Sequence, residues 1–290
     1  MSFLLFLGCT EFDFAEEWQL DRLRLLAIRA EPAEPRPGDF VSFTSLSYVP
    51  EGVEWSALWL ACVDGDTEGC TLDAALLDQL EHADEMTEAE VAALFAALQA
   101  GGLVGVEPGM PLAWVAPADA LDDLDQAARL EGKSATVTVN LVGGEDNELT
   151  LKAIPISEAT TPNHNPDLLP ITFDGVAIDA TAGVTVDAGN AIDLSVALDG
   201  TLETYTYVTT DGLSETRTEE LSFRWYTSGG TFGGSGDTGA GPPSFGGEEG
   251  VTSSDQGWIT PAEPGAYRLD AVVLDGRGGM GWQSLSVTVR

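Results

Sequence analysis

Three acidic side chains alternate in one short segment, and their spacing could serve metal binding. Asp64, Asp66 and Glu68 occupy every second position before Gly69. Alternate carboxylates can converge on one hard cation such as Ca²⁺, whose ligands are oxygen atoms. A calcium loop that begins at Asp64 needs a bidentate acid at its twelfth position, which here is Ala75. A calcium site and a solvated turn both stay open, and the missing acid favours the turn.

Two cysteines, Cys62 and Cys70, enclose this acidic segment. The third cysteine, Cys9, lies near the N-terminus. If Cys9 has a separate role, Cys62 and Cys70 remain as a pair. Such a pair can close a disulfide in an oxidising compartment. The polar, turn-rich segment between the two favours that bridge over two unrelated buried thiols. We expect no zinc site, because the chain has no further cysteine and only His82 and His164 as histidines.

Glycine-rich segments imitate a nucleotide-binding motif and a catalytic motif. Residues 276–281 match the Gly-x-Gly-x-x-Gly spacing, but pyrophosphate binding there needs a following helix. The residues that follow have the pattern of a strand, which predicts a hairpin turn instead. Ser235 follows two glycines, but Asp237 stands where a nucleophile elbow needs its last glycine. We therefore predict no catalytic residue, no nucleotide cofactor and no enzymatic activity.

An apolar run at the N-terminus ends in Gly8 and Cys9, after which the chain becomes acidic. This pattern resembles the lipobox of bacterial lipoproteins, whose cysteine becomes the lipidated first residue of the mature protein. The resemblance implies export, a lipid anchor at Cys9 and a tether over residues 10–22. Thr10 replaces the aspartate that retains enteric lipoproteins at the inner membrane, which favours the outer membrane. The alternative is a short apolar strand with a buried thiol.

The apolar run is short, and the positively charged start of a signal peptide is missing from it. We therefore expect residues 1–9 to be a truncated signal and the coding sequence to begin further upstream. No other stretch approaches the ~18 apolar residues of a membrane span, so we expect attachment through the lipid alone.

The chain carries 48 acidic and 12 basic residues among its 290, a formal net charge of -36. Such a field repels the phosphate backbone, which argues against nucleic acid as a partner. Cationic or divalent partners stay open, Ca²⁺ among them. The alternative explanation of the charge is solubility or adaptation to a salty habitat.

Apolar alternation in the first half of the chain predicts strands at 23–29, 39–48, 55–62, 134–142 and 148–156. A helical insert over residues 71–132 interrupts them, with helices expected at 71–80, 87–100 and 119–130. Thr87 and Glu90 have the spacing of a capping box, and Gly101 should end the helix that they begin. We expect the insert to pack against the strands; a partner-binding arm is the alternative.

Residues 157–167 have the composition of a linker, with two prolines and no apolar periodicity. Beyond them the pattern predicts strands at 191–198, 204–210, 221–227, 267–274 and 285–289. A glycine-rich loop is expected at 228–257. Trp258 and Trp282 could stack on a sugar, but their strand context favours the core.

Each half contains a tryptophan-centred strand, around Trp59 and around Trp225. Near the C-terminus, a strand with Tyr267 leads into an Asp275-x-x-Gly turn and a final strand. This ending is similar to that of polycystic-kidney-disease-like and related bacterial immunoglobulin-like modules, and the whole layout looks like lipoproteins of myxobacteria. Residues 225–230 depart from the signature of the polycystic type, so the resemblance implies only an immunoglobulin-like sandwich.

Together these features predict a mainly β protein with two immunoglobulin-like β-sandwich domains, at 23–156 and 168–290. We expect an envelope lipoprotein that acts as a non-catalytic binding or structural module. The alternatives are a calcium-assisted glycan-binding or adhesion protein, and an accessory subunit of an envelope enzyme complex. The expected partners are the membrane, through the lipid anchor, and an envelope protein or glycan; Ca²⁺ is the one cofactor considered.

Overall fold

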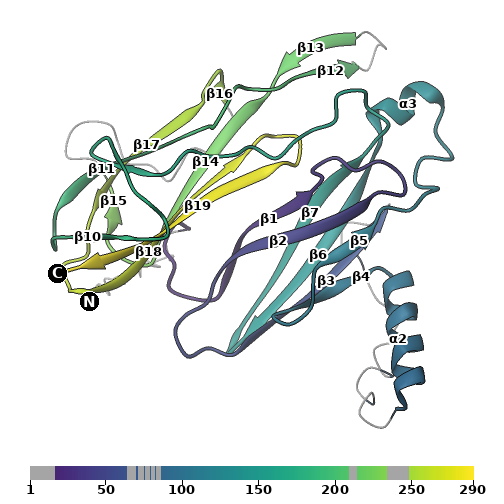
Figure 1. The fold of residues 1–290 in the computed structure, drawn as a ribbon, viewed down its shortest axis with the longest axis horizontal. Coiled ribbons are helices and arrows are strands. Elements are labelled where there is room, and N and C mark those ends of the chain that lie inside the picture. The colour runs from purple at the N-terminus through teal and green to yellow at the C-terminus, as the bar shows by residue number, and fades with distance from the viewer. Residues whose placement is uncertain are drawn as a thin grey trace, which may run out of the picture.

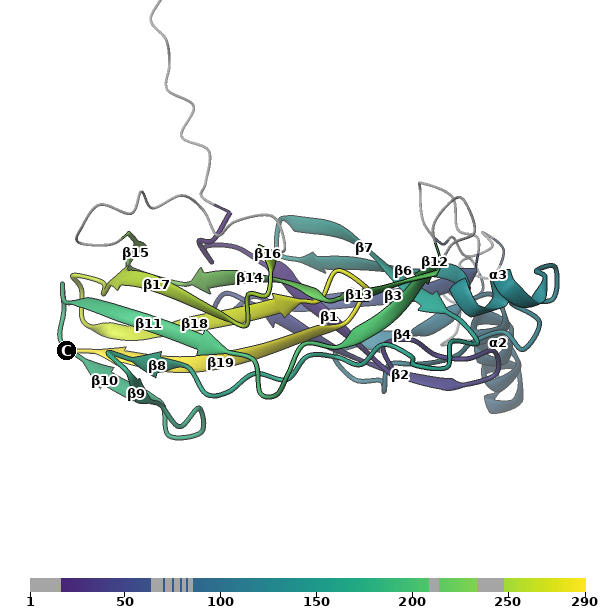
Figure 2. The same cartoon turned by 90° about the horizontal axis from the view of Figure 1, so that it is seen from above.

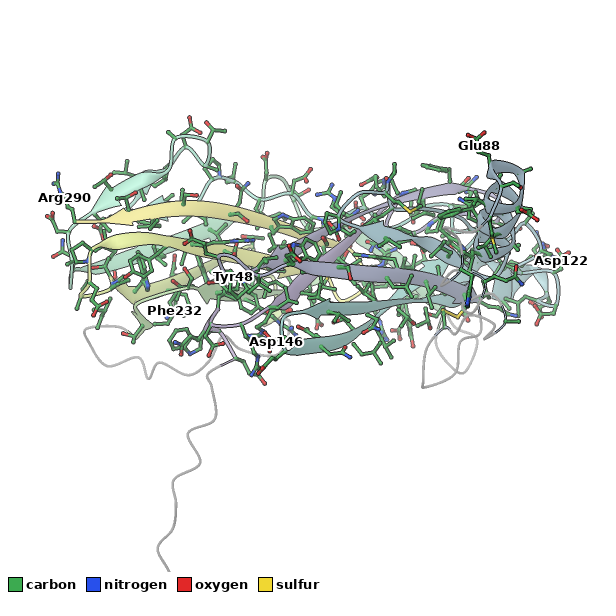
Figure 3. All side chains as sticks on the ribbon, turned by 90° about the horizontal axis from the view of Figure 1, so that it is seen from below. Tyr48, Glu88, Asp122, Asp146, Phe232 and Arg290 are labelled. Atoms are coloured by element: carbon green, nitrogen blue, oxygen red, sulfur yellow. A yellow bond between two sulfur atoms is a disulfide. The ribbon has the colours of Figure 1, made fainter. Side chains whose placement is uncertain are left out.

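The computed structural model describes residues 17–63, 70, 75, 79, 82, 86–208, 214–233 and 248–290. Two β-sandwiches lie one after the other along the long axis of the molecule (Figures 1 and 2). Arg290 marks one end, Glu88 and Asp122 mark the other, and Tyr48 lies between them (Figure 3). Among the described residues, no helix is long and apolar enough to cross a membrane.

The first sandwich has one sheet of three strands and one of four, in the orders β1-β2-β5 and β4-β3-β6-β7. Its strands are β1 (Arg24–Glu31), β2 (Phe40–Tyr48), β3 (Trp55–Val63), β4 (Leu103–Glu107), β5 (Ala113–Val115), β6 (Lys133–Gly143) and β7 (Asp146–Ile156). Alternate residues of β6 point inward because successive side chains of a strand face opposite sides. Trp59 of β3 lies fully buried in the core between the two sheets.

Helix α2 (Glu88–Ala100) confirms the predicted capping box and the predicted packing against the strands. Thr87 accepts a hydrogen bond from the backbone of Glu90, whose side chain accepts one from the backbone of Thr87. The helix buries Leu94 and Leu98 in an apolar cluster outside the four-stranded sheet. This cluster also contains Leu60 and Leu103 of that sheet.

The predicted helical insert at 71–132 is wrong in part, because it contains the strands β4 and β5. β4 is a short apolar run without alternation, which sequence alone cannot distinguish from a buried helix, and the three residues of β5 are too few to show a period. The helix predicted at 119–130 is shorter: α3 spans Gln126–Glu131, because Asp125 caps it through the backbone N–H groups of Ala127 and Ala128. The helix predicted at 71–80 lies outside the described residues, apart from Ala75 and Gln79.

The second sandwich has two sheets of five strands, in the orders β10-β19-β18-β14-β16 and β15-β17-β11-β8-β9. The first contains β10 (Val184–Val186), β14 (Glu220–Thr227), β16 (Glu248–Glu249), β18 (Gly265–Leu274) and β19 (Met280–Val289). The second contains β8 (Thr172–Phe173), β9 (Val176–Ala177), β11 (Ala191–Ala197), β15 (Thr231–Phe232) and β17 (Ser253–Ile259). A separate hairpin joins β12 (Thr204–Val208) to β13 (Ser214–Thr218).

Two hallmarks of the immunoglobulin fold appear in this second sandwich. Trp225 of β14 is buried in the core. Tyr267, near the start of β18, donates a hydrogen bond from its hydroxyl to the carbonyl of Glu263, four residues upstream, at 3.0 Å. This is the geometry of a tyrosine corner. The predicted fold class, mainly β with two immunoglobulin-like sandwiches, is confirmed.

The glycine-rich loop predicted at 228–257 is wrong over part of its length. It contains β15, β16 and five of the seven residues of β17, which pairs with β11 along its whole length. Residues 253–257 carry no large apolar side chain, so neither their periodicity nor their composition indicates a strand. Replacing most of this predicted loop, residues 229–256, by a short turn would therefore remove most of β17, which lies between β15 and β11 in its sheet. Residues 234–247 lie outside the described residues.

Residues 157–167 connect the two sandwiches, as their composition predicts, but they are not a free tether. Ser157, Asn163 and Asn165 are buried. Asn165 donates from its amide to the carbonyl of Ala30 and accepts from the backbone N–H of Met280, at 3.0 Å. The connecting segment therefore contacts both sandwiches.

Candidate functional site

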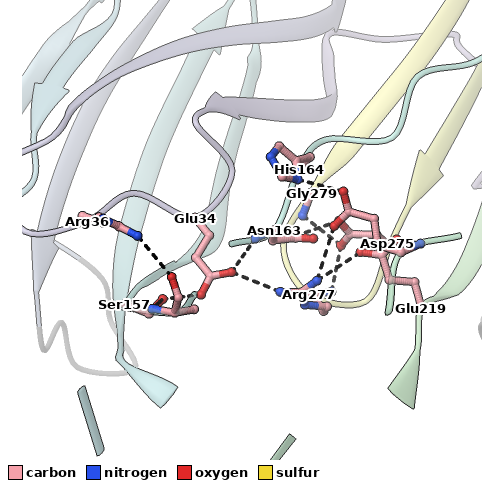
Figure 4. A network of polar contacts seen from close by, with 11 residues as sticks. Glu34, Arg36, Ser157, Asn163, His164, Glu219, Asp275, Arg277 and Gly279 are labelled. Atoms are coloured by element: carbon pink, nitrogen blue, oxygen red, sulfur yellow. Dashed lines mark hydrogen bonds and ion pairs between the residues drawn. The ribbon is translucent and has the colours of Figure 1, made fainter. Parts of the chain in front are cut away.

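A turn of the second sandwich lies against the first sandwich and forms the centre of a polar junction (Figure 4). It joins β18 to β19 and contains Asp275, whose carboxylate accepts from the backbone N–H groups of Arg277 (2.8 Å) and Gly279 (2.9 Å). The same carboxylate accepts from the side-chain amide of Asn163 at 2.8 Å. Asp275 thus fixes the turn and ties it to the connecting segment.

Arg277 projects from this turn into a group of carboxylates. Its guanidinium lies 3.1 Å from Glu34, 3.3 Å from Glu219 and 3.6 Å from Glu203. It also lies over the ring of Tyr205, 4.3 Å from the centroid. Glu34 belongs to the first sandwich and the other two carboxylates to the second, so Arg277 joins the two sandwiches.

Two of these carboxylates are withdrawn from water. Glu34 is 8% exposed and Glu219 is 5% exposed. Glu34 also accepts hydrogen bonds from the Ser157 hydroxyl and from the backbone N–H of Asn163. Burial, followed by the nearby charge of Asp275, raises the pKa of Glu219. Both carboxylates therefore need the cation beside them.

Lys152 of β7 supplies a second cation from the first sandwich. Its ammonium donates to the carbonyl of Gly278 at 2.5 Å. Burial lowers the pKa of Lys152 to about 8, although the charge of Asp275 acts in the opposite direction. The folded protein therefore holds this proton less tightly than the unfolded chain does.

This shift predicts a pH dependence of stability. Between pH of about 8 and the ordinary lysine value of 10.5, the unfolded chain binds more protons at Lys152, so stability rises with pH. Relative to Lys152→Met, the free energy of unfolding of the wild type should increase across this window. Chemical denaturation at several pH values measures both, and the comparison cancels other groups that titrate there. A constant difference would contradict the burial of a charged Lys152.

An apolar cluster continues the junction beside the polar one. Leu26 and Leu46 from the first sandwich contact Tyr226 and Val272 from the second, together with Leu20. Leu20 belongs to the expected tether at 10–22, but its backbone N–H donates to the carbonyl of Thr227, so this end of the segment packs against the second sandwich. Across the same boundary, Arg268 donates to the carbonyl of Ser47 at 2.7 Å. The two sandwiches therefore share a packed surface as well as a connecting segment.

Arg268 also pairs with Asp270, which is fully buried, at 2.8 Å. The hydroxyl of Ser284 donates to Asp270 at 2.6 Å. Burial raises the pKa of Asp270, while Arg268 and Ser284 act in the opposite direction. The charge of Asp270 is thus compensated within the second sandwich, and the same Arg268 reaches across to the first.

The predicted disulfide between Cys62 and Cys70 is confirmed, with the two Cα atoms 5.7 Å apart. The backbone N–H of Cys70 donates to the hydroxyl of Thr138 at 2.9 Å. The bridge therefore fixes the start of the insert to the outer face of the four-stranded sheet, where α2 packs.

Removing the disulfide with Cys62→Ala and Cys70→Ala together should lower the free energy of unfolding by roughly 2–3 kcal/mol, because a short covalent loop is opened in the unfolded chain. Chemical denaturation of the double variant and the oxidised wild type measures this difference. Equal stability would mean that packing alone holds the insert in place.

The other predicted site residues are placed as follows. Cys9, Asp64, Asp66, Glu68 and Ser235 lie outside the described residues, so the lipid anchor and the calcium site stay predictions. In the part of the chain that is described, no group of three His, Cys, Asp or Glu side chains could hold a metal ion.

The tryptophans considered for sugar stacking belong to packed surfaces. Trp258 is fully buried in the second core, and Trp282 packs against the junction cluster. Residues 276–281 form the turn of the β18–β19 hairpin and the start of β19, as predicted, and no helix follows them. His164 lies 2.8 Å from Glu203, at the edge of the junction.

No residue pattern in the sequence points directly to the junction. The one indirect signal is the glycine content of residues 276–281, because a hairpin turn alone does not require that many glycines. A methyl group at Gly279 would lie 2.0 Å from the Asp275 carboxylate, and one at Gly281 would lie 2.0 Å from the carbonyl oxygen of Pro166. These two glycines permit the close approach of the turn to the connecting segment.

The fold and the junction define a class: a protein of two immunoglobulin-like sandwiches joined through a buried polar contact. No family model and no curated protein sequence matches the chain. The adhesin InvE of Yersinia pseudotuberculosis aligns at 13% identity over 91% of this chain and 60% of that one, with a TM-score of 0.23.

Two further solved structures align over most of this chain. A putative membrane anchored protein of Corynebacterium diphtheriae does so at 13% identity over 93% of this chain and 59% of that one, with a TM-score of 0.24. Escherichia coli alpha-2-macroglobulin activated by porcine elastase does so at 15% identity over 96% of this chain and 22% of that one, with a TM-score of 0.23. This chain spans less than two thirds of each of these proteins, and TM-scores this low carry no argument about function.

Proposed function

We propose that this protein is a lipid-anchored protein of the bacterial cell envelope, in which two fused immunoglobulin-like sandwiches act as a non-catalytic binding or structural module. The observation that carries the proposal is the junction, where Arg277, Lys152 and Asn163 join the two sandwiches through buried contacts. A relative orientation fixed in this way suits a spacer or a presenting scaffold.

Two features support the location. The lipobox-like sequence supports a lipid on Cys9, followed by the tether predicted within residues 10–22. The disulfide between Cys62 and Cys70 fits an oxidising compartment, because such bridges persist outside the cytosol. Recognition in such modules belongs to loops and edges, because the alternating core residues are needed for packing.

Expression of the chain with its natural upstream sequence in a bacterial host tests the anchor. Intact mass should show a diacylglycerol-modified Cys9 as the first residue of the membrane-bound product. Cys9→Ser should move the protein to the soluble fraction, while Cys62→Ala, which also removes one cysteine, should leave it in the membrane fraction. An unmodified, soluble wild type would overturn the lipoprotein assignment.

A further inference from the structure

The three-stranded sheet of the first sandwich ends at β5, beside α2 and β4 (Figure 1). β5 has three residues, whereas its neighbour β2 has nine. The corresponding sheet of a constant-type immunoglobulin domain has a fourth strand. Among the described residues, no strand pairs with the outer edge of β5.

Two hydrogen bonds at the ends of β5 show how its backbone is oriented. Phe43 donates from its N–H to the carbonyl of Leu112 at 3.0 Å, and Ala116 donates to the carbonyl of Asp39 at 2.9 Å. Hydrogen-bonded and non-bonded pairs alternate along an antiparallel ladder. The middle residue of β5, Trp114, lies two positions from each of these pairs and therefore bonds to β2.

It follows that Ala113 and Val115 direct their N–H and carbonyl groups away from β2, towards the open edge. An added strand would find four backbone groups there, two donors and two acceptors. Backbone pairing of this kind is the basis of strand addition to a sheet edge.

A groove of about 770 Å³ runs along this edge. Its opposite wall contains the end of β3, at residues 61–63, and the end of α2 with the glycines that follow it. Phe40 and Val115 form a cross-strand pair at its rim and are 64% and 57% exposed. The groove therefore offers both backbone groups and apolar side chains to an extended chain.

The groove also favours positive charge. Asp119 and Asp123 line it, and Lys133, which lines it too, lies 2.9 Å from Asp123. The C-terminus of α2, which carries the partial negative charge of the helix dipole, lies at the groove, and its last turn contains no basic residue. The whole chain adds a net charge of -36. A second copy of this chain would be repelled, whereas a basic segment would be attracted.

We propose that this groove binds an extended, basic segment of a partner protein, which adds a strand to β5. The segment pairs with the outward backbone groups of Ala113 and Val115. Its apolar residues contact Phe40 and Val115, and its lysine or arginine side chains lie near Asp119 and the end of α2. This inference deepens the proposed binding function by naming the partner's chemistry, and it does not depend on the lipid anchor.

Selection from a phage library of random heptapeptides on the immobilised full chain tests the proposal. The enriched peptides should alternate apolar residues with lysine or arginine, and their binding should weaken as salt is added. Enrichment of acidic or proline-rich peptides, or no enrichment at all, would overturn the proposal. So would self-association of the wild type that the selected peptide abolishes, because the occupant would then be a second copy.

Two variants of Val115 locate the peptide. Val115→Pro removes the outward N–H, which β2 does not use, and proline is tolerated where an edge N–H faces solvent. Val115→Lys places a like charge at an exposed position in the groove. Each variant should lower the affinity for the selected peptide by about ten-fold or more, because the loss of one strong contact changes the binding constant by about that factor.

Matched controls lie at the outer edge of β9 in the second sandwich, with which no described strand pairs. The bond from Ile178 N–H to the carbonyl of Ile171 shows that the N–H of Ala177 points away from β8. Ala177→Pro and Val176→Lys, at an exposed residue, should leave peptide binding unchanged. Wild-type affinity in a folded Val115→Lys, as judged by circular dichroism, would place the peptide elsewhere and overturn the proposal.

Discussion

Replacing Arg277 with methionine should lower the free energy of unfolding by about 3–5 kcal/mol, because it leaves buried carboxylates without their cation. Methionine keeps much of the side-chain volume, so the effect measures charge rather than a cavity. Glu34 and Glu219, each less than 10% exposed, lose the guanidinium that lies 3.1 and 3.3 Å away. Chemical denaturation of the full chain measures the loss.

The pH dependence of this loss separates charge from packing. Burial already raises the folded pKa of Glu219 in the wild type, and removing Arg277 should raise it further, so the folded variant binds this proton more tightly. The penalty is complete above the folded pKa of the variant and disappears below the folded pKa of the wild type, where Glu219 is protonated in both proteins. The destabilisation of Arg277→Met should therefore shrink as the pH is lowered. A loss that does not depend on pH would assign the effect to packing.

Arg217 provides the matched control for Arg277. It also pairs with a glutamate, Glu215 at 3.2 Å, and stacks on a tyrosine ring, but it is 44% exposed on the β12–β13 hairpin. Exposed pairs contribute at most about 1 kcal/mol, so Arg217→Met should be nearly neutral. Small-angle scattering should show a more extended molecule for Arg277→Met and no change for Arg217→Met. Similar results for the two variants would contradict the central role of the junction.

The strands that form the two cores could be predicted from the sequence because their alternation is long and regular. β6 and β7 each span eleven residues, and the predicted boundaries differ from the observed ones by at most two residues. Strand β17 could not be predicted in the same way. Its residues before Trp258 are small or polar, and only its pairing with β11 makes it a strand.

The junction could not be predicted because its partners are far apart in the sequence and ordinary in type. Arg277 and Glu34 are separated by 243 positions, and Asn163 and Glu34 by 129. Nothing in a proline-rich segment signals that Asn163 is buried. The disulfide, in contrast, joins residues only eight positions apart, so counting cysteines was sufficient to predict it.

Gly281→Ala should be among the most destabilising single methyl additions in this chain, with a loss of about 3 kcal/mol or more in the free energy of unfolding. The new Cβ would lie 2.0 Å from the carbonyl oxygen of Pro166 and 3.1 Å from its carbonyl carbon. Backbone atoms cannot rotate away, so β19 or the connecting segment must shift. Gly281 does not have a positive φ, so the substitution tests close approach without adding backbone strain.

Such a shift would also disturb the hydrogen bonds on either side of Gly281. Met280 donates from its N–H to the side chain of Asn165 at 3.0 Å, and Gln283 donates to the carbonyl of Leu168 at 2.8 Å. These bonds hold the connecting segment and the residue that follows it against β19. Their loss should add to the cost, because buried polar groups left without partners are expensive.

Gly276→Ala is the control in the same hairpin. Gly276 has a φ of 74°, and its added Cβ would lie 3.6 Å from the nearest atom, the carbonyl oxygen of Glu220. The cost there is backbone strain alone, about 1–2 kcal/mol. Denaturation curves of the two variants should rank Gly281→Ala well below Gly276→Ala in stability. The reverse order, or a Gly281→Ala variant as stable as the wild type, would mean that these glycines serve only the hairpin turn and not the contact between the two sandwiches.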